Sequence, residues 1–136
     1  REYIISYGVG GLSSKENSYG TPPGLHIIKE KIGEGLPPGT LFNATKPTTK
    51  IINEYCPLNP LSRIEITSRI FTLEGLEEKV NRGGNLDTYN RKIWIHGTPH
   101  TCWLGKPASH GCIRVHQNEI TELFKMVNEG TPVFIY

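Results

Sequence analysis

The chain has 136 residues, a length that fits one domain, because chains usually divide only above about 250–300 residues. Its net charge of +2 and charged fraction of 21% give no strongly basic face, so nucleic-acid binding is not indicated. No apolar stretch approaches the ~20 residues that span a bilayer. The sequence begins at Arg1 without a signal peptide, so we expect a trimmed or processed N-terminus. We therefore expect a single domain over residues 1–136.

Three cysteines, Cys56, Cys102 and Cys112, are too few for the disulfide framework of a small secreted domain. If Cys112 reacts as a free thiol, two alternatives remain for the other two. They can pair with each other in an oxidising compartment, or they can be two unrelated small apolar residues. The sequence leaves both open.

Short segments rich in β-branched and aromatic residues favour strands throughout the chain. In chain order they are Tyr3–Tyr7, His26–Ile32, Ile64–Leu73, Lys92–His96, Cys112–Val115 and Val133–Tyr136. Turn-forming sequences such as Thr21-Pro22-Pro23-Gly24 separate them. The pattern predicts a mainly β domain, a sandwich or a barrel-like fold.

One prominent helix is predicted before the last strand. Its apolar positions recur at helical spacing, at Ile120, Leu123, Phe124 and Val127. Asn118 is suited to be the N-cap, and Gly130 stands where a C′ glycine is expected. We expect the helix to pack on the sheet and to take no part in chemistry.

The segment Arg91–Val115 holds most of the reactive side chains. If Lys92–His96 is a strand, alternation places Ile93 and Ile95 in the core and His96 on the opposite face. If the second half is also extended, three polar side chains share one face: His110, Cys112 and Arg114. The side chains of the two halves are therefore expected to meet at one site on the surface of the sheet.

A thiol, an imidazole and a guanidinium at one mouth suit acyl transfer. A free thiol has a pKa of about 8.5 and is mostly protonated at neutral pH. A neighbouring histidine can take its proton or, as imidazolium, lower its pKa. The thiolate then attacks a carbonyl, and Arg114 can hold a carboxylate through a bidentate contact.

These residues resemble the signature of the YkuD-type L,D-transpeptidase family. That signature is a His-Gly stretch followed, about a dozen residues later, by Ser/Thr-His-Gly-Cys-x-Arg. The chain carries it as His96-Gly97-Thr98 and Ser109-His110-Gly111-Cys112-Ile113-Arg114. The resemblance extends to the Thr21–Gly24 turn, the strand at Ile66–Ile70 and the Gly130–Val133 segment, and so covers most of the chain.

The chain departs from the family pattern in three ways. Gln117-Asn118-Glu119 stands where an Asn-x-Asp pattern is commoner. The first strand of the family domain is shortened or absent, which is consistent with a trimmed N-terminus. No peptidoglycan-binding module accompanies the domain, so its targeting to the wall is left open.

The resemblance implies a mainly β catalytic domain that acts on peptidoglycan stem peptides without a metal or organic cofactor. Cys112 would be the nucleophile and His96 its acid–base partner, and His110 belongs to the same catalytic group. Cys112 would form a thioester with the third residue of a stem tetrapeptide, release the terminal D-residue and pass the acyl group to an amine.

The remaining motif residues have supporting roles in this resemblance. The main-chain N–H groups of Gly111 and Cys112 would lie at the oxyanion site. Ser109 and Arg114 complete the motif, with substrate positioning as the role of Arg114. The carbonyl of Gly97 would orient the histidine.

The resemblance also implies a setting for the enzyme. The chain would act as a monomer in the periplasm or extracytoplasmic cell wall, and a carbapenem could inhibit it. We further expect the Gly- and Pro-rich segment Thr98–Ala108, which carries Trp103, to form a lid over the site.

Three alternatives stay open. With water as acceptor, the same site would give L,D-carboxypeptidase or endopeptidase activity. A zinc site would draw on His96, His100, Cys102, His110, Cys112 and His116. It lacks a Cys-x-x-Cys pair, and Gly97 and Pro99 oppose the helix that would align two of its histidines. A catalytically silent wall-binding domain would leave the paired histidine and cysteine without a role.

Overall fold

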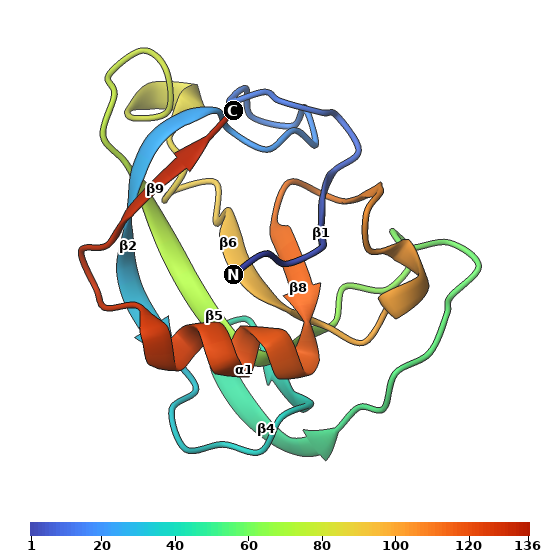
Figure 1. Ribbon diagram of the computed structural model, residues 1–136. Helices are drawn as coiled ribbons and strands as arrows, with labels where there is room; N and C mark the ends of the chain where they lie inside the picture. The colour runs from blue at the N-terminus through green and yellow to red at the C-terminus, as the bar shows by residue number, and fades with distance from the viewer.

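The computed structural model describes residues 1–136 as nine strands, one α-helix and two short 3-10 turns (Figure 1). In chain order the elements are β1 (Ile5–Gly8), β2 (Gly24–Ile32), β3 (Thr40–Asn43), β4 (Lys46–Ile51), β5 (Ile66–Gly75), η1 (Gly84–Leu86), β6 (Trp94–Thr98), η2 (Thr101–Trp103), β7 (Pro107–Ser109), β8 (Ile113–His116), α1 (Gln117–Met126) and β9 (Pro132–Ile135). The predicted mainly β fold with one prominent helix is confirmed. All nine strands join one sheet.

The sheet runs in the order β4-β3-β5-β6-β8-β1-β7, and β2 pairs with β5 and carries β9 on its outer side. Most neighbours are antiparallel, but β6 and β8 run parallel at the centre. Parallel strands need a long crossover, and here the crossover is made of η2 and β7 instead of a helix. The pairing sets His96 of β6 opposite Arg114 of β8. Both halves of the predicted motif therefore lie side by side.

Alternation along the central strands gives the sheet two different faces. One face packs under α1 as the main apolar cluster, made of Ile28, Phe71, Leu73, Ile95, Ile113, Val115, Ile120 and Phe124. The opposite face carries a smaller cluster of Phe42, Ile66, Ile70 and Trp94, with Cys112 packed against it. The predicted inward position of Ile95 is confirmed. Ile93 precedes β6 and is buried outside both clusters.

The helix packs on the sheet as predicted, with Ile120 and Phe124 buried. The Phe124 ring stacks on Phe71 of β5 with 5.6 Å between the ring centroids. The predicted caps are wrong. His116 is the N-cap and its side chain accepts from the Asn118 N–H, because β8 runs directly into the helix. The helix ends at Met126, so Gly130 lies in the turn beyond it and is not the C′ residue.

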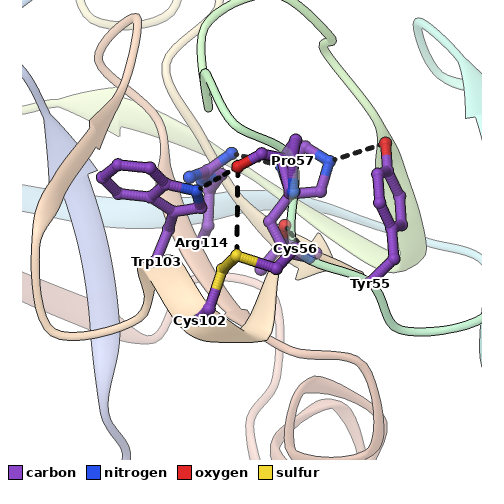
Figure 2. The surroundings of a disulfide bond; sticks show 8 residues. Tyr55, Cys56, Pro57, Cys102, Trp103 and Arg114 are labelled. Atoms are coloured by element: carbon purple, nitrogen blue, oxygen red, sulfur yellow. Dashed lines mark hydrogen bonds between the residues drawn. A yellow bond between two sulfur atoms is a disulfide. The ribbon is translucent and has the colours of Figure 1, made fainter.

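A disulfide joins Cys56 to Cys102, with 5.6 Å between their Cα atoms (Figure 2). This decides between the two alternatives for these cysteines and leaves Cys112 as a free thiol. The bridge ties η2 to the segment between β4 and β5, which has no regular secondary structure. The indole N–H of Trp103 donates to the Pro57 carbonyl over 2.9 Å and adds a second tie. None of the helices has the length and apolarity that crossing a membrane requires.

Removing the disulfide should destabilise the protein substantially, because the bridge closes a loop with a sequence separation of 46. We expect the Cys56→Ser/Cys102→Ser variant to lose about 2–4 kcal/mol of unfolding free energy. Denaturant unfolding monitored by tryptophan fluorescence measures this. As a control, Cys112→Ser keeps the bridge and should cost less than about 1 kcal/mol. Equal stability of the double variant and the wild type would contradict the prediction.

Candidate active site

A cavity of about 350 Å³ opens on the face of the sheet opposite α1. Strands β6 and β8 and the turns that precede them form its floor. The turn between β3 and β4 contributes Ala44, and the segment Pro60–Ile66 forms a further wall. Five predicted site residues line this cavity: His96, Ser109, His110, Cys112 and Arg114. The structure thus brings together the two halves of the sequence motif.

The Cys112 thiol is partly buried and is bonded to the main chain. The Trp94 N–H donates to Sγ over 3.3 Å, and the thiol donates to the Lys92 carbonyl over 3.5 Å. No hydrogen bond joins Sγ to His96. The thiol proton is therefore directed at Lys92 in this state, and its transfer to the imidazole requires a movement of the sulfur.

His96 is buried, with 3% of its surface exposed. Its Nδ1 lies 2.8 Å from the carbonyl oxygen of Gly97, as the resemblance implied. A carbonyl only accepts, so Nδ1 carries the proton and Nε2 is left with a free lone pair. A Cβ on Gly97 would lie 2.4 Å from the carbonyl oxygen of Thr67 in β5, so only glycine allows this close approach.

The same burial sets the charge state of both groups. Burial lowers the pKa of His96 to about 4, and the positive charge of Arg114 acts in the same direction. Burial also raises the pKa of the Cys112 thiol, against the opposing effects of the Trp94 N–H, Arg114 and Arg91. Near neutral pH both groups are uncharged. The imidazole is available as a base, and the imidazolium that the sequence left as an alternative is not favoured.

A turn with several hydrogen bonds holds Cys112. Ser109 Oγ donates to the Cys112 carbonyl over 2.6 Å and accepts from the Gly111 N–H over 3.2 Å. Thr21 Oγ1 donates to the Gly111 carbonyl over 2.8 Å. Gly111 has a φ of 134°, and a Cβ there would lie 2.6 Å from Ile93 Cδ1. The Gly111 N–H is therefore already engaged, whereas the Cys112 N–H makes no hydrogen bond.

His110 reaches the edge of the cavity but not the thiol. Its ring packs edge-on against Tyr19, with 4.9 Å between the ring centroids. It makes no hydrogen bond to Cys112 or His96. The predicted grouping of His110 with the catalytic pair thus has a place at the cavity but no bond to either partner.

Arg114 is only 5% exposed and is held from two sides. Its Nε donates to Ser6 Oγ over 2.9 Å, and its Nη1 donates to His100 Nδ1 over 3.2 Å. Its Nη2 is buried without any partner. Sequence reasoning missed Ser6 entirely and considered His100 only as a zinc ligand. No signal in the sequence links either residue to the motif.

The predicted lid is wrong. No residue of Thr98–Ala108 lines the cavity, because Trp103 and the disulfide fasten this segment to Pro57 instead. The wall of the cavity comes from Pro60–Ile66. The zinc alternative gains no support either, since Cys102 is in a disulfide and no three metal-binding side chains form a group.

Residues 1–135 match the family model of the YkuD L,D-transpeptidase catalytic domain. The chain belongs to this family. It is 38% identical over 60 residues to the L,D-transpeptidase homologue YkuD of Bacillus subtilis. This match covers 40% of the chain and 37% of that protein.

Solved L,D-transpeptidases share the fold. One from Mycobacterium tuberculosis H37Rv superimposes with a TM-score of 0.54 and 16% identity, over 98% of this chain and 42% of that one. L,D-transpeptidase 3 from Mycobacterium tuberculosis, solved with a faropenem-derived adduct, gives a TM-score of 0.53 and 17% identity. That match covers 97% of this chain and 43% of that one. The matches cover less than half the length of each of these relatives.

The rate at which iodoacetamide alkylates Cys112 should show that the thiol of this cavity is uncharged in the resting protein. Because burial raises the thiol pKa above its ordinary value of about 8.5, the thiolate is a minor species near neutral pH and its fraction increases with each unit of pH up to that pKa. We expect the alkylation rate to keep rising between about pH 6 and pH 9. Mass spectrometry can follow the single free thiol, since Cys56 and Cys102 are bridged. A rate that is constant from pH 6 to pH 8 would instead show a preformed thiolate.

Proposed function

We propose that the chain is a peptidoglycan L,D-transpeptidase with Cys112 as nucleophile and His96 as acid–base partner. One observation carries this proposal. A free thiol and an imidazole whose Nε2 is unprotonated line the same cavity, and the imidazole is fixed by a main-chain carbonyl. Membership of the family supports the proposed activity.

In the first step the thiol leaves the Lys92 carbonyl and gives its proton to Nε2 of His96. The sulfur attacks the carbonyl carbon of the third stem residue. The Cys112 N–H is the free donor for the resulting oxyanion, and one such donor contributes about 2.7–4 kcal/mol. The carbon–nitrogen bond to the terminal D-residue breaks, and its amine leaves with the proton from His96. The product is a thioester on Cys112.

In the second step an amine attacks the thioester. His96 takes a proton from this amine, and the Cys112 thiolate leaves and receives that proton from the imidazolium. If water replaces the amine, the same residues give L,D-carboxypeptidase or endopeptidase activity. The acceptor therefore decides between transfer and hydrolysis, while the acylation step is common to both.

The charge of the cavity suits an anionic donor. Four cationic residues line it (Arg63, Arg91, Lys92 and Arg114) but only one acidic residue, Glu65. This excess stands out in a chain with a net charge of only +2. Stem peptides carry free carboxylates, and closely spaced cations of this kind attract them. The cavity charge thus supports a carboxylate-bearing acyl donor.

The proposed substrate places the protein in the periplasm or in the extracytoplasmic cell wall. The Cys56–Cys102 disulfide supports this location, because disulfides persist mainly in oxidising compartments. Inhibition by a carbapenem, with acylation of Cys112, follows from the same mechanism. The faropenem-derived adduct of the Mycobacterium tuberculosis relative supports inhibition by a β-lactam, by analogy of fold.

The decisive experiment incubates the protein with a disaccharide-tetrapeptide and identifies the products by mass. Transfer gives a cross-linked dimer, and hydrolysis gives the tripeptide alone. We expect Cys112→Ala to abolish both reactions and the covalent adduct with imipenem. We expect His96→Asn to slow turnover by at least about 100-fold, since a general base contributes about 10²–10⁴ in rate. Full activity of Cys112→Ala would refute the assignment.

A second experiment tests the cavity charge. Arg63 and Lys92 are exposed at its rim, so the double substitution Arg63→Ala/Lys92→Ala should lower kcat/KM for the tetrapeptide about tenfold at low salt. The deficit should shrink at about 0.5 M salt, because salt screens exposed charges. Arg82→Ala is the control, since Arg82 is exposed but lies outside this cavity. A deficit that does not change with salt would argue against charge attraction.

A further inference from the structure

A hydrogen-bonded network of Tyr55, Glu65, His100 and Arg114, here called the relay, lies beside the cavity. The proposed two-step chemistry gives its first three residues no role. His100 is completely buried. Its Nδ1 lies 3.2 Å from Arg114 Nη1, and its Nε2 lies 3.0 Å from Glu65 Oε1 and 3.2 Å from the Tyr55 hydroxyl. The Tyr55 hydroxyl also donates to Glu65. Tyr55 and Glu65 come from the segment between β4 and β5, His100 follows β6, and of the three only His100 contacts the guanidinium of Arg114.

The protonation of His100 follows from its partners. A guanidinium only donates, so Nδ1 must accept and cannot carry a proton. The ring proton is then on Nε2 and is donated to Glu65. Burial lowers the pKa of His100, against the opposing effect of Glu65, which agrees with a neutral ring. The neutral ring thus lies between a cation and a carboxylate and contacts both.

The relay fixes the direction of Arg114. With Nε bonded to Ser6 and Nη1 bonded to His100, the planar guanidinium cannot rotate without breaking a bond. Its Nη2 is the buried donor that the protein leaves without a partner. An unpaired buried donor is costly, and an oxygen of a bound ligand would remove this cost.

The disulfide fastens the outer half of this relay. Tyr55 precedes the bridged Cys56, and the Tyr55 N–H donates to the carbonyl of Pro99 next to His100 over 3.0 Å. Figure 2 shows Tyr55, Trp103 and Arg114 around the bridge. The segment that carries Tyr55 has no regular secondary structure of its own. The bridge therefore fixes the position of Tyr55 relative to His100.

We propose that His100, Glu65 and Tyr55 are positioning residues. They hold Arg114 so that its Nη2 donates a hydrogen bond to an oxygen of the acyl donor. This inference rests on the proposed function and deepens it. His100 acts through the acceptor lone pair of Nδ1 and takes no proton in the reaction. Its loss should weaken donor binding and leave the acylation chemistry of Cys112 and His96 intact.

The test compares His100→Leu with His100→Asn in steady-state kinetics with the disaccharide-tetrapeptide. Leucine removes the acceptor, so KM should rise about tenfold, as expected for the loss of one charge-assisted contact, while kcat stays within about twofold. Asparagine places Oδ1 near the former Nδ1 and should bring KM back to within about threefold of wild type. Equal KM values for the two variants, or a loss confined to kcat, would overturn the proposal.

His26→Leu is the matched control for the loss of a buried histidine. His26 is also fully buried and bonded through both ring nitrogens, to Gly24 and Thr88, but it does not line the cavity. We expect this variant to melt at a lower temperature with KM unchanged. A KM increase equal to that of His100→Leu would show that the effect is only one of stability, and would also overturn the proposal.

A substrate-free measurement separates this inference from the proposed function. In ¹⁵N NMR of the wild-type protein, His100 should show an unprotonated Nδ1 and a protonated Nε2 near neutral pH. A protonated Nδ1 would overturn the relay whether or not the protein turns over the tetrapeptide. If the relay is confirmed but the wild type neither converts the tetrapeptide nor reacts with imipenem, the proposed function fails and the kinetic part of this inference fails with it.

Discussion

The parallel pairing of β6 with β8 is the contact on which the site depends. It sets His96 opposite Arg114 and places Cys112, just before β8, on the same face of the sheet. Because side chains alternate along a strand, a slip of one residue would turn Cys112 into the apolar cluster under α1. The register is fixed by Ile95, Ile113 and Val115, which fill that cluster from the other face. Packing on one side of the sheet thus determines the chemistry on the other.

Burial then does more than hold the reacting groups in place. His96 loses its water shell and with it the ability to stay protonated near neutral pH, while the same environment disfavours the thiolate of Cys112. The main-chain contacts at Gly97 and Lys92 fix where each proton lies. In the proposed mechanism, charge develops only once a substrate enters and the Cys112 N–H gains a partner.

Sequence reasoning found what depends on local periodicity. Strand alternation placed Ile95 in the core and His96 opposite it, and helical spacing identified the buried face of α1, with Ile120 and Phe124. It did not find the hairpin of β3 and β4, because β3 has only four residues and β4 is rich in Thr and Lys with little apolar alternation. It also missed β7, which has three residues and begins with proline. The Gly97 carbonyl contact was anticipated from the family resemblance. The partners of Arg114 were not, because Ser6 and His100 meet it, and Glu65 meets His100, only through long-range folding.

The raised pKa of the free thiol has a consequence for a protein that also contains a disulfide. Exchange between a thiol and a disulfide proceeds through the thiolate, and so does oxidation of cysteine by peroxides. A sulfur that stays protonated in the resting protein reacts slowly in both ways. Cys112 can thus remain reduced beside the Cys56–Cys102 bridge, without scrambling it, in surroundings that would oxidise an ordinary exposed cysteine.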